Sequence, residues 1–174
     1  MNIHSIPIQG RLAERFKKGV IQKVEMVAPI SEWNGIYSIY SCDEELSLSE
    51  ENPNIAGGSY VTDDKGGTFT FTHNDGSKET FQLYPNTPVI LMESGLLKSE
   101  YWFAFTLLHE LGHHNDPNRP MKPTYNGEIF AHLFAFDRLC GHQDKFHRLD
   151  ETPPYLYYEA LQIHQAQCPD CRLK

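Results

Sequence analysis

The sequence predicts an α+β fold in which a β-rich first half, residues 1–98, and a helical second half, residues 99–174, share one core. Runs rich in aromatic and β-branched residues recur between positions 36 and 85, separated by Gly, Asn and Asp clusters. Beyond residue 99, apolar residues recur at helical spacing instead. A chain of 174 residues is long enough for one ordinary core and short for two, so a single domain is expected.

The first expected element is an amphipathic helix over residues 10–27. Apolar positions recur there close to a helical period, and Gly19 is its weak point because glycine is a poor helix former. The apolar positions are Leu12, Phe16, Val20, Ile21, Val24 and Met26.

Four runs are then expected to form an antiparallel β-meander. They are IYSIYS at 36–41, GSYVT at 58–62, TFTFTH at 68–73 and ETFQLYP at 79–85. The clearest turn is 74–77, where Asp75-Gly76 supplies the positive φ values that a tight hairpin requires. The apolar run 88–92 follows as a strand expected to be covered on both faces.

Three helices complete the expected fold, over residues 99–114, about 126–140 and about 154–167. Ser99 is a suitable N-cap for the first of these helices. Proline and asparagine between 115 and 123 end it, and Pro153-Pro154 precedes the last helix. No internal repeat or low-complexity segment is visible.

Composition excludes several classes of function. Lys and Arg number 15 against 23 Asp and Glu, and the net charge of -8 argues against direct binding of nucleic acid. The first twenty residues lack the apolar stretch of a secretory signal, and no apolar run is long enough to cross a membrane. Four scattered cysteines do not resemble a disulfide framework. A cytoplasmic protein with reduced thiols is expected, and its oligomeric state is not predicted.

The segment HELGHH, residues 109–114, carries the clearest chemical pattern. His109 and His113 are four residues apart, so a helix places both imidazoles on one face, where they can bind one zinc ion. Zinc lowers the pKa of bound water to about 7, and Glu110 is placed to accept its proton. A chance HExxH with solvated histidines is the competing explanation, but the apolar run before the motif favours one catalytic Zn²⁺.

The third zinc ligand is expected from the next helix. Metzincins use a histidine six residues after the second ligand, and Arg119 occupies that position here. Glu128 opens the following helix, although a carboxylate there also has a simpler use at a helix N-terminus. Gly112 and Ala131 are small, which indicates that a backbone or a substrate comes close to the motif and that two helices can approach each other.

These motifs resemble those of the ImmA/IrrE family of small zinc metallopeptidases, over about residues 86–140. The resemblance rests on His109-Glu110-Leu111-Gly112-His113 and on Glu128, Ala131, Phe134, Ala135 and Leu139. It implies a minimal gluzincin-like fold, zinc ligands His109, His113 and Glu128, and Glu110 as general base. Members are typically encoded by mobile elements or stress-response operons, and some cleave or inactivate a helix-turn-helix repressor.

The chain departs from the family pattern at two positions. Members often have asparagine where this chain has His132, and a further histidine where it has Pro117. We expect His132 to contact the substrate or to stabilise the oxyanion. The alternative is a histidine that supports a ligand or packs in the core. Tyr125 is a second candidate donor, and His114 a third.

The pair Cys168 and Cys171 forms a CxxC knuckle that, with Cys140 and His142 or His147, has the composition of a structural zinc site. A single CxxC is weak evidence, so an unbound reduced pair is expected rather than a second zinc. SprT-like metalloproteins also combine HExxH with a cysteine knuckle, with His142 as the third ligand in that minor alternative.

The function predicted is that of a zinc-dependent endopeptidase acting on a cytoplasmic protein, such as a repressor or other transcriptional regulator. The strand near 88–92 is expected to flank the cleft, and an extended substrate to pair with an exposed sheet edge. The alternative is a non-catalytic module, for instance an antitoxin, inhibitor or regulator that keeps the fold and sequesters a partner. Glu110 argues against that alternative, because a pure binder needs no base beside the water.

Overall fold

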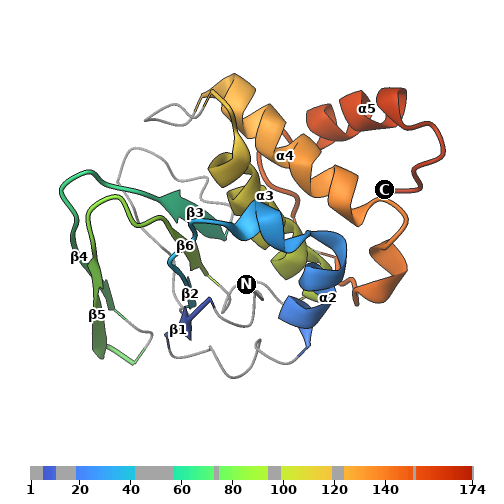
Figure 1. The fold of residues 1–174 in the computed structure, drawn as a ribbon. Coiled ribbons are helices and arrows are strands. Elements are labelled where there is room, and N and C mark those ends of the chain that lie inside the picture. Colours follow the sequence, from blue (N-terminus) through green and yellow to red (C-terminus); the bar gives the residue numbers. More distant parts are fainter. Residues whose placement is uncertain are drawn as a thin grey trace.

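The computed structural model describes residues 6–10, 19–41, 57–72, 75–93, 99–118, 124–150 and 152–173. These residues form an α+β fold, as predicted, with the helices gathered on one side and the strands on the other (Figure 1). The helices are α2 (Val20–Val27), α3 (Glu100–Asn115), α4 (Tyr125–Leu139) and α5 (Tyr157–Gln167), with short 3₁₀ turns η2 (Ile30–Trp33) and η3 (Gln143–Lys145). No helix within these ranges is both long and apolar enough to cross a membrane.

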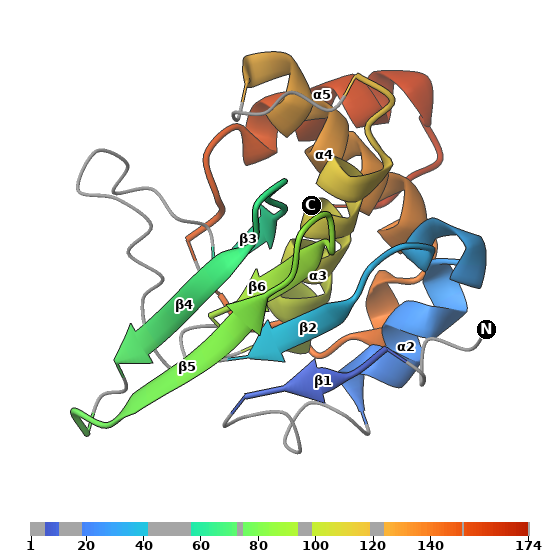
Figure 2. The same cartoon turned by 60° about the vertical axis from the view of Figure 1, so that its left-hand side comes forward.

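The main sheet has four strands in the order β1-β2-β6-β3. They are β1 (Ile8–Gln9), β2 (Ser38–Ser41), β6 (Val89–Met92) and β3 (Gly58–Val61), and Figure 2 shows them side by side. Neighbours β1, β2 and β6 are parallel, whereas β3 is antiparallel to β6. The predicted meander is therefore wrong for this sheet, because parallel strands need a crossover and β2 pairs with a strand far along the chain.

Strand β6 is central, and all four of its residues are buried, which confirms that it is covered on both faces. The edges of the sheet are β1 and β3 among the described residues. The strand near 88–92, which was expected to flank the cleft, is therefore an inner strand of the sheet. Strand β3 pairs with β6 on one side and forms an edge of the sheet.

The predicted hairpin is confirmed as a separate two-stranded sheet of β4 (Gly67–Thr72) and β5 (Lys78–Leu83). Thr70 pairs with Thr80 in its register, and Gly76 has the positive φ of 80° expected in the turn. Asn74, the first turn position, lies outside the described residues. The hairpin extends away from the helices (Figure 1).

The N-terminal helix is described only from Val20 onward, so the predicted positions Leu12 and Phe16 lie outside the described residues. Val20, Ile21 and Val24 are buried as expected, but Met26 is exposed and does not belong to the apolar face.

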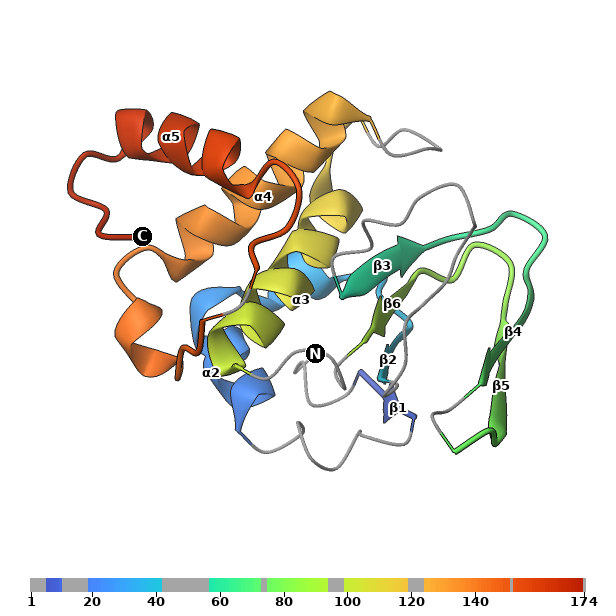
Figure 3. The same cartoon turned by 180° about the vertical axis from the view of Figure 1, so that it is seen from behind.

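Helix α3 is the central helix, because thirteen of its sixteen residues are buried. Ser99 caps it as predicted, accepting a hydrogen bond from the backbone N–H of Trp102 at 3.1 Å. Seen from behind, α4 lies between α3 and α5 (Figure 3). The main apolar core contains residues of both halves, among them Val24, Ile90, Leu108 and Leu161. The HExxH segment is thus carried on the most buried helix of the described residues.

Candidate metal centre

Two histidines of α3 and one carboxylate of α4 bring their ligand atoms together. His109 Nε2 lies 3.0 Å from His113 Nε2. The two Glu128 oxygens lie 3.3 Å from His109 Nε2 and 3.4 Å from His113 Nε2. Zinc bonds of about 2.1 Å at tetrahedral angles separate two ligand atoms by about 3.4 Å. The three residues therefore fit the predicted zinc site, with one coordination position left for water or substrate.

The close approach of α3 and α4 makes this arrangement possible. A Cβ atom on Gly112 would lie 2.8 Å from Ala131 Cα and 3.1 Å from the Ala131 carbonyl oxygen. Such distances are shorter than atomic contacts allow, so a glycine is required at this crossing. The backbone predicted to come close to Gly112 is thus that of α4 at Ala131, and this contact holds Glu128 opposite the histidines.

Burial keeps both ligand histidines neutral. It lowers the pKa of His109 to about 3, and together with the neighbouring His109 it lowers the pKa of His113 to about 4. A neutral imidazole has the lone pair that a metal requires. At neutral pH, the two side chains are therefore already in the protonation state that binds zinc.

Glu110 is held beside the ligands with only 4% of its surface exposed. Its carboxyl accepts a hydrogen bond from the backbone N–H of Tyr60, on β3. Burial, and then the charge of Glu128, raise the pKa of Glu110 to about 8. A carboxyl with a raised pKa next to a ligand cluster is typical of an acid–base catalyst.

Strand β3 can reach Glu110 because its first residue is Gly58. A Cβ atom there would lie 2.7 Å from Thr106 Cγ2 and 3.0 Å from Glu110 Cγ. The strand backbone thus packs directly on α3, which aligns Tyr60 with the carboxyl.

His132 lies behind His109, with 2% of its surface exposed. Its Nε2 is 2.7 Å from the Tyr155 carbonyl oxygen, and its Nδ1 is 2.6 Å from His109 Nδ1. A carbonyl only accepts, so Nε2 carries the proton, and burial lowers the pKa of His132 to about 4, which keeps the ring neutral. His132 Nδ1 must then accept a hydrogen bond from His109 Nδ1.

This chain of hydrogen bonds leaves the lone pair of His109 on Nε2, the atom that lies near Glu128. Both nitrogens of His132 are engaged in it. The geometry therefore favours the supporting role for His132 over the expected contact with substrate or oxyanion.

The other two candidate donors have different partners. The Tyr125 hydroxyl donates to the Glu159 carboxylate of α5, on an exposed part of the surface. His114 Nε2 donates to the Asn34 carbonyl oxygen at 2.8 Å, and its Nδ1 lies 3.2 Å from the Tyr60 hydroxyl. These contacts do not place Tyr125 or His114 with the ligand triad.

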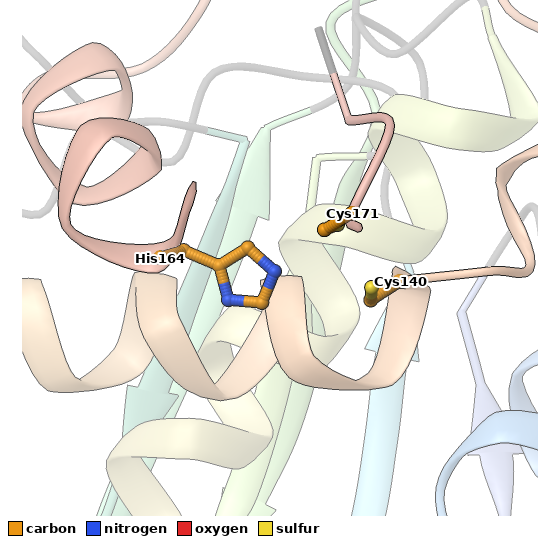
Figure 4. Close-up of side chains that lie close together, drawn as sticks. All are labelled: Cys140, His164 and Cys171. Atoms are coloured by element: carbon orange, nitrogen blue, oxygen red, sulfur yellow. The ribbon is translucent and has the colours of Figure 1, made fainter. Parts of the chain in front are cut away.

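A second cluster of ligand-type residues lies elsewhere in the fold. The ligand atoms of Cys140, His164 and Cys171 all lie within 4.8 Å of one another, and Figure 4 shows these three side chains. His142 and His147, the expected companions of the CxxC pair, do not belong to this group. His164 was missed because it is distant from Cys140 in sequence, although it precedes Cys168 by one helical turn.

Comparisons with known proteins give no relative: no protein-family model, no curated protein and no solved structure matches the chain. Function is therefore inferred from the chemistry of the two clusters.

Proposed function

We propose that the chain is a zinc-dependent endopeptidase of ImmA/IrrE type that cleaves a cytoplasmic protein, with a transcriptional regulator as the favoured substrate class. The observation that carries this proposal is that buried Glu110 follows His109 on α3 and lies near enough to Glu128 to be affected by its charge, while His109, His113 and Glu128 form the ligand cluster. Three protein ligands with an open fourth position are typical of catalytic zinc sites. Glu128 lies with the two histidines, so the SprT-like alternative, which needs His142, has no support.

A bound zinc ion supplies a Lewis acid that lowers the pKa of water to about 7 and polarises the scissile carbonyl. Glu110 accepts the proton of the attacking water and passes it to the leaving amine nitrogen. The nearby positive charge opposes the effect of burial on this carboxyl and favours its ionised form. The Tyr60 N–H holds the carboxyl in place, and His132 fixes the orientation of His109.

Strand β3 is the proposed binding edge for the substrate. It is hydrogen-bonded to β6 on one side and to no strand on the other among the described residues. Its backbone also contacts Glu110. An extended peptide that paired with β3 would pass the general base and be held by main-chain hydrogen bonds, largely independent of its sequence.

The proposal is tested with purified, zinc-loaded protein and a library of peptides, with cleavage detected by mass spectrometry. Glu110→Gln preserves the shape and the hydrogen bond from Tyr60 but cannot accept a proton. We expect zinc content to stay normal and the cleavage rate to fall at least about 100-fold, since a general base contributes that much or more. Asp64→Asn, an exposed acidic residue outside the site, is the control and should cleave normally.

A variant Glu110→Gln that cleaves as fast as the parent would remove the general base from the mechanism. The non-catalytic regulator would be favoured by two results together. The zinc-loaded parent would cleave no peptide, and Glu110→Gln would perform the cellular task as well as the parent.

A further inference from the structure

The ligand atoms of Cys140, His164 and Cys171 lie within 4.8 Å of one another where α4 and α5 end, and Cys168 adds a thiol 3.8 Å from that of Cys140. Cys140 is the C-cap of α4, and Cys168 is the C-cap of α5. Cys171 follows in a turn that is closed by a hydrogen bond from its N–H to the Cys168 carbonyl at 3.0 Å. His164 lies one helical turn before Cys168 on α5. The pattern His164-x₃-Cys168-x₂-Cys171 therefore meets Cys140 from a different helix.

His164 has no hydrogen bond within the described part of the chain, although only 2% of its surface is exposed. Its Nδ1 lies 3.1 Å from the Asp137 carboxylate, but the angle does not suit a hydrogen bond. The ring points toward Cys140 and Cys171 (Figure 4). A buried polar group without a hydrogen bond costs about 1–3 kcal/mol. A cation bound to the His164 ring would supply the missing partner.

The remaining nitrogen, Nε2, is free to bind that cation. A metal-bound histidine usually has a carboxylate on the side of its other ring nitrogen, and the Asp137 carboxylate lies near Nδ1 without forming a hydrogen bond.

The sulfur spacing distinguishes a metal site from a disulfide. Cys140 Sγ and Cys168 Sγ lie 3.8 Å apart. A disulfide requires about 2.05 Å. Two zinc–sulfur bonds of about 2.3 Å at a tetrahedral angle place the sulfurs about 3.8 Å apart. The observed distance excludes a disulfide between these two cysteines and is compatible with two thiolates on one zinc ion.

We propose that Cys140, His164 and Cys171 bind a second zinc ion, which is structural, and that Cys168, whose thiol lies against that of Cys140, turns in to become the fourth ligand. Four protein ligands leave no position open for water, in contrast to the site of His109, His113 and Glu128. The ion would join the ends of α4 and α5. It would thereby fix the position of α5. The segment just before α5 contains Tyr155, whose carbonyl oxygen accepts the hydrogen bond from His132. This inference does not depend on the protein being a peptidase.

The test is the number of zinc ions per chain in protein purified under reducing conditions. We expect two for the parent and one for either His113→Ala or Cys171→Ser, because each variant loses a different site. His147→Ala is the matched control, since this exposed histidine lies outside both clusters, and it should retain two. One zinc in the parent and none in His113→Ala would overturn the second site and leave the first intact.

Cobalt substitution of the parent keeps the test independent of whether Cys171→Ser folds. Thiolate ligands give cobalt an intense near-ultraviolet charge-transfer band, which a His₂Glu site cannot produce. We expect this band in the parent and in His113→Ala. Its absence from a parent loaded with cobalt, or an intact mass two hydrogens below that of the reduced chain, would contradict the proposal. The latter result would identify a disulfide.

Discussion

The Nδ1 atoms of His109 and His132 lie 2.6 Å apart in the interior, with His132 fixed on its other side by the carbonyl of Tyr155. The link joins α3, α4 and the segment before α5 into one hydrogen-bonded chain. Because the chain ends in a carbonyl, only one arrangement of protons is consistent with neutral rings. His109 is thus oriented as a ligand before any ion binds.

Replacing His132 by Ala should weaken zinc binding by about 10–100-fold, the usual cost of losing the partner of a metal-bound histidine. Zinc affinity is measured by competition with a chelator of known strength. His132→Asn should lie between the parent and Ala, because its amide oxygen can still accept a hydrogen bond from His109. At saturating zinc, we expect turnover in both variants to stay within a few-fold of the parent. Normal affinity with strongly reduced turnover would instead support the oxyanion role.

Gly112→Ala should destabilise the protein, because the added methyl group meets Ala131 Cα at 2.8 Å. Overpacking of this kind costs about 1–3 kcal/mol. The helices must separate to relieve the contact, so Glu128 should move away from the histidines and zinc affinity should fall as well. Urea unfolding and chelator competition measure the two effects.

Gly67→Ala is the matched control, since no atom lies within 4 Å of a Cβ at that position. Its free energy of unfolding should stay within about 1 kcal/mol of the parent value. A Gly112→Ala variant as stable as this control, and with normal zinc affinity, would show that the helix crossing tolerates a side chain.

Much of this centre was predictable, because its information is local. The i, i+4 spacing of His109 and His113 fixes their common face on any helix, and the small residues Gly112 and Ala131 anticipated the crossing that the structure shows. Strand pairing was not predictable in the same way. Strand β2 pairs with β6 rather than with the next run, and nothing in the alternation of either strand specifies a parallel partner so far along the chain.

The contacts between distant segments in the two clusters could not be predicted, for the same physical reason. His164 belongs with Cys140 because α4 and α5 pack together, a contact that sequence spacing does not encode. Nearness to Cys140 in the sequence favours His142 or His147 as the histidine ligand instead. Similarly, the engagement of both His132 nitrogens depends on the Tyr155 carbonyl, a backbone atom whose position only the fold determines.

The stability of metal-free protein should depend on pH through Glu110. Its carboxyl pKa is raised from 4.5 to about 8, so between these values the unfolded chain releases a proton that the folded chain keeps. Stability contributed by this group is therefore full below pH 4.5 and is lost as the pH rises to 8. Glu110→Gln does not titrate, so it should become more stable than the parent across this window.

The difference in the free energy of unfolding between metal-free Glu110→Gln and the metal-free parent should reach at most about 5 kcal/mol, since each pKa unit contributes about 1.36 kcal/mol. This difference is called the gap below. Urea unfolding of both metal-free proteins at several pH values measures it. Saturating zinc should narrow the gap, because a cation stabilises the ionised carboxyl. A gap independent of pH in the metal-free proteins would show that Glu110 titrates normally in the fold.

Gly58→Ala should separate catalysis from metal binding. The new Cβ would meet Thr106 Cγ2 at 2.7 Å and Glu110 Cγ at 3.0 Å, so β3 must move away from α3 or the carboxyl must turn. Either movement disturbs the hydrogen bond from Tyr60 to Glu110, while His109, His113 and Glu128 keep their contacts. We expect normal zinc content and a turnover reduced between tenfold and a hundredfold, since a small misplacement of a catalytic group has effects of that size.

A double variant tests whether the cause is steric. Thr106→Ser removes the Cγ2 methyl that makes the closest contact, so in the Gly58→Ala background it should restore part of the turnover, whereas alone it should change little. The contact with Glu110 Cγ remains, which is why the rescue should be incomplete. If Gly58→Ala lost zinc instead, β3 would support the ligands rather than the base. If turnover stayed at the parent level, the position of β3 would not control the Glu110 carboxyl at all.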